Sequence, residues 1–295
     1  MEIINCPQCN CNSFDDFLSV TDFTVSRETF KIVECKRCHL KYTNPRPAEK
    51  LLGSYYESET YISHSDTNAG FISKAYKAVR TISLRRKCAL INSLGSTHKT
   101  ILDIGCGTGA FLNTMSEDNW KTTGIEPNDS ARAKAVAKYG LTVYEEKFLD
   151  EAPIQYDVIT LWHVLEHVYH LRKRLNEILQ RMHSGSTLVV AVPNCDSSDA
   201  KYYQQYWAAY DVPRHLYHFN PSTMESLMDD NGLRVVQKVT MPFDAYYVAM
   251  LSEKYKNSKQ NLIGAMYQGV LSNLHSVKEV DKCSSIVYII KLKEH

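Results

Sequence analysis

The sequence of 295 residues contains no run of roughly 18 uninterrupted apolar residues, the length that a membrane-spanning helix needs. Its first residues have neither the basic flank nor the apolar run of a secretion signal. It also has no excess of charge, because 34 Lys and Arg balance 33 Asp and Glu to a net charge of +1. These absences predict a cytoplasmic protein without a membrane span. They also argue against nucleic acid as a partner, since a polyanion is bound through a basic excess.

The cysteines do not form the pattern of a disulfide-stapled protein. Nine Cys is an odd number, and four of them fall into two pairs with C-x2-C spacing, which favours a reducing compartment. The chain is 44% hydrophobic and 23% charged, as ordinary globular proteins are. A chain of this length builds a sufficient core without disulfides.

The two cysteine pairs are candidate zinc ligands. Cys6 and Cys9 form one pair, and Cys35 and Cys38 form the other. Each pair places two thiolates on one side of a tight turn, so that together they surround a tetrahedral Zn²⁺. The separation of the pairs is longer than the roughly 15–20 residues usual for such sites, and Cys11 is a rival ligand.

These cysteines predict a zinc ribbon over residues 1–45. The expected role of the metal is structural, because about 45 residues cannot bury enough apolar surface to fold alone. The alternative is recognition of RNA or of a protein partner. Residues 1–50 hold seven basic and seven acidic side chains, so no phosphate-tracking patch is evident and the structural role is favoured.

The rest of the chain divides into two parts. Residues 46–98 follow two prolines and have mainly helical spacing, which predicts a helical linker or lid. Residues 99–295 alternate between strand and helix patterns, which predicts right-handed βαβ units and a mostly parallel sheet. Long interruptions near 196–220 and 242–282 are candidate insertions that face a substrate. The strands are expected at 100–104, 121–125, 141–144, 157–162, 186–192, 233–239 and 285–292.

The most informative motif follows the first of these strands. Gly105, Gly107 and Gly109 stand between the strand and a helix, where glycines let the backbone turn sharply and approach a ligand closely. Asp103 lies inside the strand before them. Glu126 ends the second strand, at the distance along the chain where a carboxylate binds both hydroxyls of a cofactor ribose.

Together these features resemble the class I S-adenosylmethionine-dependent methyltransferases over roughly residues 99–295. The resemblance implies an α/β fold with a Rossmann-like seven-stranded methyltransferase sheet, whose last strand inserts antiparallel next to the fifth. The small zinc ribbon and the helical cap would precede this sheet. The cofactor-binding residues that it implies are Asp103, Gly105, Cys106, Gly107, Glu126, Pro127, Phe148, Leu149 and His163.

The N-terminal region carries a second resemblance. Two C-x2-C pairs followed by Tyr-Thr-Asn-Pro-Arg-Pro at 42–47 and by a Tyr-Tyr helix are similar to bacterial methyltransferases associated with sugar and cell-surface glycan pathways. Some of those transfer the methyl to a sugar carbon and carry a further large C-terminal domain, which this sequence does not show. The resemblance implies a small-molecule acceptor, and a sugar or nucleotide-sugar is the expected class. Without that domain, transfer to carbon is disfavoured, so a hydroxyl is the expected acceptor group, with transfer to nitrogen as the less favoured alternative.

Transfer of a methyl group to a hydroxyl requires alignment and removal of a proton, so a base is expected near the end of the fourth strand. His163, Glu166 and His167 stand there, spaced to share one face of an opening helix. In related quinone O-methyltransferases an E-x-x-E-H version of this motif holds a divalent metal, but His163 replaces the first acid, which leaves metal use open. The alternative for Glu166 and His167 is a packed, hydrogen-bonded helix start.

A second candidate site lies at 206–219, beyond the fifth strand. His215 is a candidate base that Asp211 would orient, and Arg214 a candidate phosphate ligand. Trp207 and Tyr210 are candidates for stacking on a sugar or aromatic ring. The alternative is a buried polar network that braces the insertion. The predicted catalytic residues are therefore His163, His167, His215 and Asp211.

Two other functions compete with transfer to a small molecule. An RNA methyltransferase that grips its substrate with the ribbon would show a basic stripe, and the neutral charge counts against it. A non-catalytic module that uses the fold for assembly would show no turnover. The sequence leaves open the acceptor atom and the oligomeric state.

Overall fold

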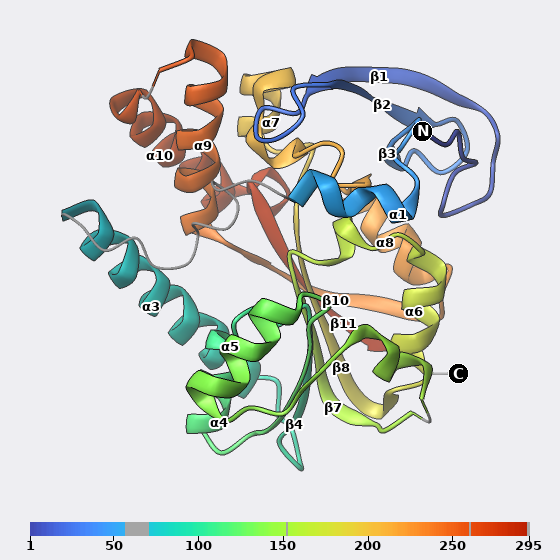
Figure 1. Cartoon of the computed structure of the whole chain (residues 1–295), viewed down its shortest axis with the longest axis vertical. Coiled ribbons are helices and arrows are strands. Elements are labelled where there is room, and N and C mark those ends of the chain that lie inside the picture. Colours follow the sequence, from blue (N-terminus) through green and yellow to red (C-terminus); the bar gives the residue numbers. More distant parts are fainter. Residues whose placement is uncertain (57–70, 152, 260, 294–295) are drawn as a thin grey trace.

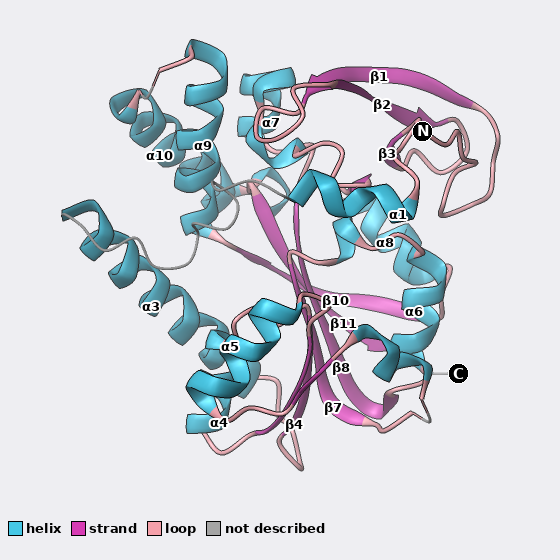
Figure 2. Cartoon of the chain, in the orientation of Figure 1, coloured by secondary structure: helices cyan, strands magenta, loops and turns pink. Residues whose placement is uncertain are grey.

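The structure, a computed structural model, describes residues 1–56, 71–151, 153–259 and 261–293. It contains a seven-stranded sheet and a four-stranded sheet. Helices cover both sides of the large sheet, and the N-terminal sheet lies at one end of it (Figures 1 and 2). None of the helices in the described part is long and apolar enough to cross a membrane.

The large sheet has the strand order β10-β11-β8-β7-β4-β5-β6. Strands β8 to β6 in this order are parallel, and β11 is antiparallel to both of its neighbours, β8 and β10. This arrangement confirms the predicted sheet, including the last strand beside the fifth. The strands are β4 (Thr100–Ile104), β5 (Lys121–Ile125), β6 (Val143–Tyr144), β7 (Tyr156–Trp162), β8 (Met182–Pro193), β10 (Leu233–Thr240) and β11 (Ser285–Leu292).

The central strands are largely buried because helices cover both faces of the sheet. Every residue of β7 except Trp162 is buried, and so are seven consecutive residues of β8. The helices beside the sheet are α3 (Phe71–Asn92), α4 (Ala110–Glu117), α5 (Asp129–Tyr139), α6 (Leu171–Leu179) and α8 (Pro221–Asp229).

One helical expectation needs correction, and another lies partly outside the described residues. Part of the predicted lid, residues 57–70, lies outside the described residues, and its described part comprises α1 (Glu49–Leu52), the 3-10 turn η1 (Gly53–Tyr56) and α3. The predicted helix opening at 163–167 is a single 3-10 turn, η3 (Leu165–His167). His163, with a φ of 57°, lies in the left-handed region and cannot open a regular helix, and the extended Val168, with φ −66° and ψ 121°, ends the turn.

The N-terminal sheet is not confined to the N-terminal region. Its strands are β1 (Phe14–Thr21), β2 (Thr29–Cys35), β3 (Lys41–Thr43) and β9 (Tyr217–His218), in that order across the sheet. Because β9 comes from the insertion near 196–220 and pairs with β3, the ribbon and the insertion share one sheet. This pairing crosses the boundary predicted at residue 45.

The two insertions pack against each other. The side chain of Asp199 accepts hydrogen bonds from Trp207 in the first insertion and from Ser272 in the second. Tyr203 donates to Glu253 in the same way across the two insertions. Their elements are α7 (Ser198–Tyr203), η4 (Gln204–Tyr206), η5 (Ala208–Tyr210), α9 (Pro242–Asn257), α10 (Leu262–Lys278) and η6 (Val280–Lys282).

A buried guanidinium joins the ribbon to the first insertion. Arg214 is 1% exposed and donates two hydrogen bonds to Asp211, at 3.0 and 2.7 Å, and one to Asp22 in the ribbon, at 2.9 Å. Burial would raise the pKa of Asp22, but hydrogen bonds from Arg214 and from the backbone of Ser26 outweigh it and hold that pKa below its ordinary value. Both carboxylates are therefore charged and paired with Arg214.

Replacing Arg214 by Met should lower the free energy of unfolding by about 3–5 kcal/mol, because the change leaves the buried Asp22 and the half-buried Asp211 carboxylates without their partner. Urea denaturation followed by circular dichroism measures the loss. The matched control is Lys31→Met, which removes an exposed ion pair with Asp16 and should cost less than about 1 kcal/mol. Similar losses in the two variants would contradict the joining role of Arg214.

Candidate active site

The glycine loop after β4 leaves room for a ligand at one position. A side chain at Gly105 would clash, because its Cβ would lie 2.4 Å from the Val164 side chain. At Gly107, which has a φ of 55°, no described atom lies within 4 Å of the corresponding position. Gly105 therefore serves packing, whereas the backbone at Gly107 faces open space, as a cradle for a bound cofactor requires.

Glu126 connects the end of β5 to this loop. One carboxylate oxygen accepts the backbone N–H of Gly107 at 2.8 Å, and the other accepts that of Asn128 at 2.9 Å. The side chain is almost completely buried, whereas the next residue, Pro127, is exposed. A carboxylate held beside the open face of the loop is in the position from which the resemblance implied that it binds a ribose.

Asp103 lies in β4 below the loop. It is buried and accepts a hydrogen bond of 2.6 Å from the Thr160 hydroxyl on the neighbouring strand β7. Burial raises the pKa of Asp103 to about 7, although this hydrogen bond and the Lys87 ammonium both oppose the shift. Lys87 reaches the region from α3 and lies over the Trp162 ring, 4.1 Å from its centroid. The predicted contact of Asp103 with the cofactor stays a prediction.

The other predicted cofactor residues line the same edge of the sheet. Phe148 and Leu149 are buried in the 3-10 turn η2 (Glu146–Asp150) that follows β6, and Phe148 stacks on Tyr144 at 4.3 Å between ring centroids. The Cys106 thiol packs toward Gly124, where an added Cβ would lie 2.7 Å from its Sγ. Cys106 can therefore offer a ligand only its backbone.

His163 is held between two carboxylates. Its Nε2 lies 2.9 Å from Asp244, and its Nδ1 lies 3.3 Å from Glu166. Burial lowers the pKa of His163, but the two carboxylates outweigh burial and raise it to about 9. A ring with this pKa carries a positive charge at neutral pH, and the catalytic role of His163 stays a prediction.

Sequence reasoning missed Asp244 as a site residue. It lies in the first turn of α9, so the second insertion reaches the end of β7 through this carboxylate. The one signal in the sequence was an acid directly after the Pro-Phe that starts the helix. The contact of Asp244 with His163, however, joins residues that are 81 positions apart in the chain. Only the folded chain shows that contact.

Glu166, His167 and His215 form one cluster. Each offers a ligand atom within 4.8 Å of the others, and the two imidazole rings lie 4.5 Å apart, nearly perpendicular. A backbone hydrogen bond of 2.8 Å from Leu216 to the Glu166 carbonyl holds the two segments together. The structure thus brings together two histidines that the sequence placed in separate motifs, and the chemistry of this donor set also suits a divalent cation.

The two histidines have different surroundings. Burial lowers the pKa of His167 to about 4, and the neighbouring His215 adds to the shift, so His167 is neutral at pH 7. The Nδ1 of His215 lies 2.9 Å from the Ala209 carbonyl. Because a carbonyl only accepts, Nδ1 carries the proton and the neutral ring has its lone pair on Nε2, 4.0 Å from Asp211.

Three predicted contacts with an acceptor are not open in this structure. Trp207 and Tyr210 are each 2% exposed, so neither ring offers a stacking surface. Arg214 donates to Asp22, Asp211 and the Tyr55 carbonyl, which leaves it enclosed instead of free to bind a phosphate. The part of the chain around these residues therefore corresponds to the alternative reading, a buried network that braces the insertion.

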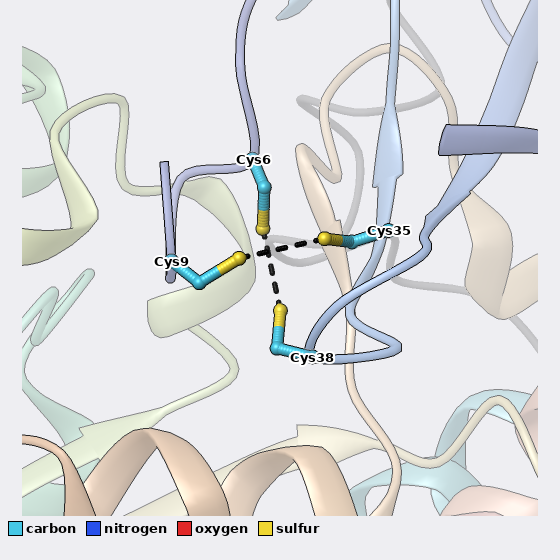
Figure 3. A group of neighbouring side chains, drawn as sticks. All are labelled: Cys6, Cys9, Cys35 and Cys38. Carbon is cyan, nitrogen blue, oxygen red and sulfur yellow. Dashed lines mark hydrogen bonds between the residues drawn. The ribbon is translucent and has the colours of Figure 1, made fainter. Parts of the chain in front are cut away.

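Four cysteines converge in the N-terminal region (Figure 3). The Sγ atoms of Cys6 and Cys38 lie 3.4 Å apart, those of Cys9 and Cys35 lie 3.5 Å apart, and all four lie within 4.8 Å of one another. Two crossed pairs of thiols at these separations fit a single tetrahedral metal ion. The residues present therefore suit the predicted zinc.

The two turns that carry these cysteines share one backbone pattern. The N–H of Cys6 donates to the carbonyl of Cys11, and the N–H of Cys35 donates to the carbonyl of Leu40. Cys11 itself points elsewhere, with its thiol 3.7 Å from the Ser13 carbonyl. The rival ligand is therefore outside the group of four.

Comparison with known proteins identifies the family. Residues 78–238, more than half of the chain, match the family model described as a methyltransferase domain. The chain belongs to this methyltransferase-domain family. The matched range contains the glycine loop, Glu126 and the Glu166, His167 and His215 cluster, but neither the four cysteines nor α9 and α10.

The relatives and solved structures agree with this assignment. The chain is 34% identical over 93 residues to a ubiquinone biosynthesis O-methyltransferase of Sodalis glossinidius, covering 29% of this chain and 37% of that protein. It is 31% identical over 101 residues to the protein of the same name from Pseudomonas paraeruginosa, covering 32% and 44%. The chain thus matches less than half of the length of these curated relatives.

Solved methyltransferases share the fold at low identity. The magnesium protoporphyrin IX methyltransferase of Synechocystis PCC 6803, solved with S-adenosylhomocysteine bound, has a TM-score of 0.54 at 11% identity and covers 83% of this chain and 100% of that one. The mitomycin 7-O-methyltransferase has a TM-score of 0.50 at 14% identity and covers 82% of this chain and 60% of that one.

Proposed function

We propose that this protein transfers a methyl group from S-adenosylmethionine to a hydroxyl of a small molecule. The observation that carries the proposal is the open backbone at Gly107 beside the Glu126 carboxylate, at the same edge of the sheet as the half-buried His167 and the buried His215. Ligands bind at this edge in open α/β sheets. Membership of the methyltransferase-domain family and relatives that are named O-methyltransferases support the same reaction.

The cofactor would be held by the loops after β4, β5 and β6. The backbone at Gly105 and Gly107 would line its methionine part, Glu126 would hold the ribose, and Phe148 and Leu149 would flank the adenine. When bound, S-adenosylmethionine supplies a methyl group on a positively charged sulfur. The Glu126 carboxylate already holds the glycine loop through the Gly107 N–H. Cofactor binding would therefore cost little conformational entropy in this loop.

His215 is the proposed base. Its Nδ1 is fixed by the Ala209 carbonyl, which leaves Nε2 to take the hydroxyl proton of the acceptor. Asp211, 4.0 Å from Nε2, stabilises the imidazolium that then forms. His167 is a neutral neighbour against which the His215 ring packs.

Within small molecules, a sugar or nucleotide-sugar is the proposed acceptor class. It is supported by the similarity of the N-terminal cysteine pairs and the following Tyr-rich segment to glycan-associated methyltransferases. Because Arg214 is enclosed by carboxylates, the phosphates of a nucleotide-sugar would need other donors. A panel of sugar, nucleotide-sugar and phenolic acceptors, assayed for S-adenosylhomocysteine release, decides between these classes.

We also propose that Cys6, Cys9, Cys35 and Cys38 hold a structural Zn²⁺. The convergence of the four thiols supports this assignment, and so does the matched backbone of the two turns. The ion would fasten the N-terminal turn to the end of β2. It would act beside the hydrogen bonds that the Gln8 side chain donates to Ser226 of α8 and to Asp230 directly after that helix.

The purified protein should contain one zinc per chain by elemental mass spectrometry. Cys38→Ser should lose the metal and lower the midpoint of thermal unfolding, because a site with three thiolates binds Zn²⁺ much more weakly. Cys11→Ser is the matched control and should keep both the zinc and the midpoint. Loss of zinc from the Cys11 variant alone would mean that the ligands are assigned wrongly.

Glu126→Ala should weaken binding of S-adenosylmethionine and S-adenosylhomocysteine by about 10- to 100-fold in calorimetric titration, since hydrogen bonds to a charged group contribute about 1.5–3 kcal/mol. Glu145→Ala, which removes an exposed carboxylate nearby, should bind both as the unaltered protein does. No binding by the folded, zinc-loaded unaltered protein would favour a non-catalytic module instead.

His215→Ala should reduce kcat by about 100-fold or more, while affinity for S-adenosylmethionine stays within a small factor, because a positioned base contributes about 10²–10⁴-fold. His167→Ala, measured separately, tests the neighbouring ring. His170→Ala, an exposed histidine at the start of α6, is the control and should keep full turnover. Unchanged turnover in both the His215 and the His167 variants would refute the proposed base.

A further inference from the structure

Helix α10 (Leu262–Lys278) turns its large apolar side chains toward solvent. Seven of them remain 42% to 86% exposed among the described residues. They recur at helical spacing, so they form one continuous stripe along the helix. The stripe consists of Leu262, Ile263, Met266, Tyr267, Val270, Leu274 and Val277.

The opposite face of α10 carries small residues. Its buried positions are Ala265, Gly269, Ser272 and Ser276. The helix packs closely on α9 there, because an added Cβ at Gly269 would lie 2.4 Å from the Tyr246 ring. The small side chains thus allow close packing inside the chain but bury little apolar surface.

This distribution is the reverse of an ordinary surface helix. A helix at the edge of a globular protein turns its bulky apolar side chains to the core and its polar ones to water. In α10 the bulky side chains face outward. The outer face is therefore expected to be covered by another surface, because contiguous apolar patches of this size mark interaction sites.

We propose that a second copy of this chain covers the stripe, with α10 of one copy packed antiparallel against α10 of the other. The stripe exposes on the order of 800 Å², an upper bound that is close to what each partner of a standard-size interface buries. A two-fold axis places the same face on both sides, and the stripe contains no charged residue that would repel its copy. The helix lies beside α9 at the outer edge of the molecule (Figure 1).

The composition of α10 argues for this occupant over a lipid surface. Helices that lie on membranes carry Lys and Arg along their polar face. Within α10, Lys278 at the last position is the one Lys or Arg. A neutral apolar stripe of aliphatic side chains with one tyrosine instead fits the composition of homodimer interfaces, whose cores are depleted in charge.

The pairing would also support the active site. The first turn of α9 carries Asp244, which holds His163, and Tyr246 two residues later packs under α10 at Gly269. A partner pressed on α10 would therefore stabilise the helix that positions His163. The inference itself does not depend on the proposed reaction, since it rests on the exposed stripe alone.

Sedimentation velocity and light scattering on the zinc-loaded full chain test the proposal. The unaltered protein should have twice the chain mass of 33.7 kDa at micromolar concentration. The double variant Ile263→Lys, Val277→Lys changes the two most exposed positions of the stripe. It should raise the dimer dissociation constant by at least about 30-fold, the effect of losing one strong interface contact, with an unchanged circular dichroism spectrum.

Val136→Lys is the matched control, because it places a lysine on an exposed apolar position of a different helix, α5. This variant should remain a dimer. A monomeric unaltered protein would overturn the proposal, as would a double variant that dimerises as tightly as the unaltered chain. The fold is not at risk in either variant, since the changed side chains face solvent.

Discussion

The ion pairs of Arg214 fix the geometry on which the rest of the site depends. A guanidinium that is 1% exposed is stable only with its charge compensated, and Asp22 and Asp211 supply that compensation from the ribbon and from the insertion. The residue that follows, His215, is therefore fixed relative to both. Its backbone neighbour Leu216 then binds the Glu166 carbonyl, which carries the constraint to the edge of the large sheet. The ribbon thus acts on the site through a buried charge.

The candidate active site is a junction of segments that are far apart in the sequence. The glycine loop and Glu126 come from the methyltransferase sheet, whereas Asp244 and His215 come from the two insertions. Their charges differ because their surroundings differ. Two carboxylates keep His163 protonated, while burial beside His215 keeps His167 neutral. One short motif therefore yields a cation and a neutral imidazole four residues apart.

The parts outside the matched methyltransferase domain lie at both ends of the chain. The four cysteines converge at one end of the molecule, and β9 pairs the ribbon with the insertion through β3. In α10 the small residues pack against the rest of the chain, and the large apolar residues are exposed to solvent. Both features concern surface that a single methyltransferase sheet does not need, and both bear on the insertions that close over the site.

Local spacing in the sequence determined the sheet, the glycine loop with Glu126 and the two cysteine pairs, because each depends on residues close together in the chain or on the alternation of strands and helices. Tertiary structure alone decided what the polar residues of the insertions do. Arg214 forms a buried ion pair, whereas the sequence suggested a phosphate ligand. Asp244, which the sequence did not single out, is the partner of His163. The contact of Arg214 with Asp22 and that of Asp244 with His163 join positions far apart in the sequence. A local motif does not predict such contacts, and the burial and charge state of these side chains depend on them.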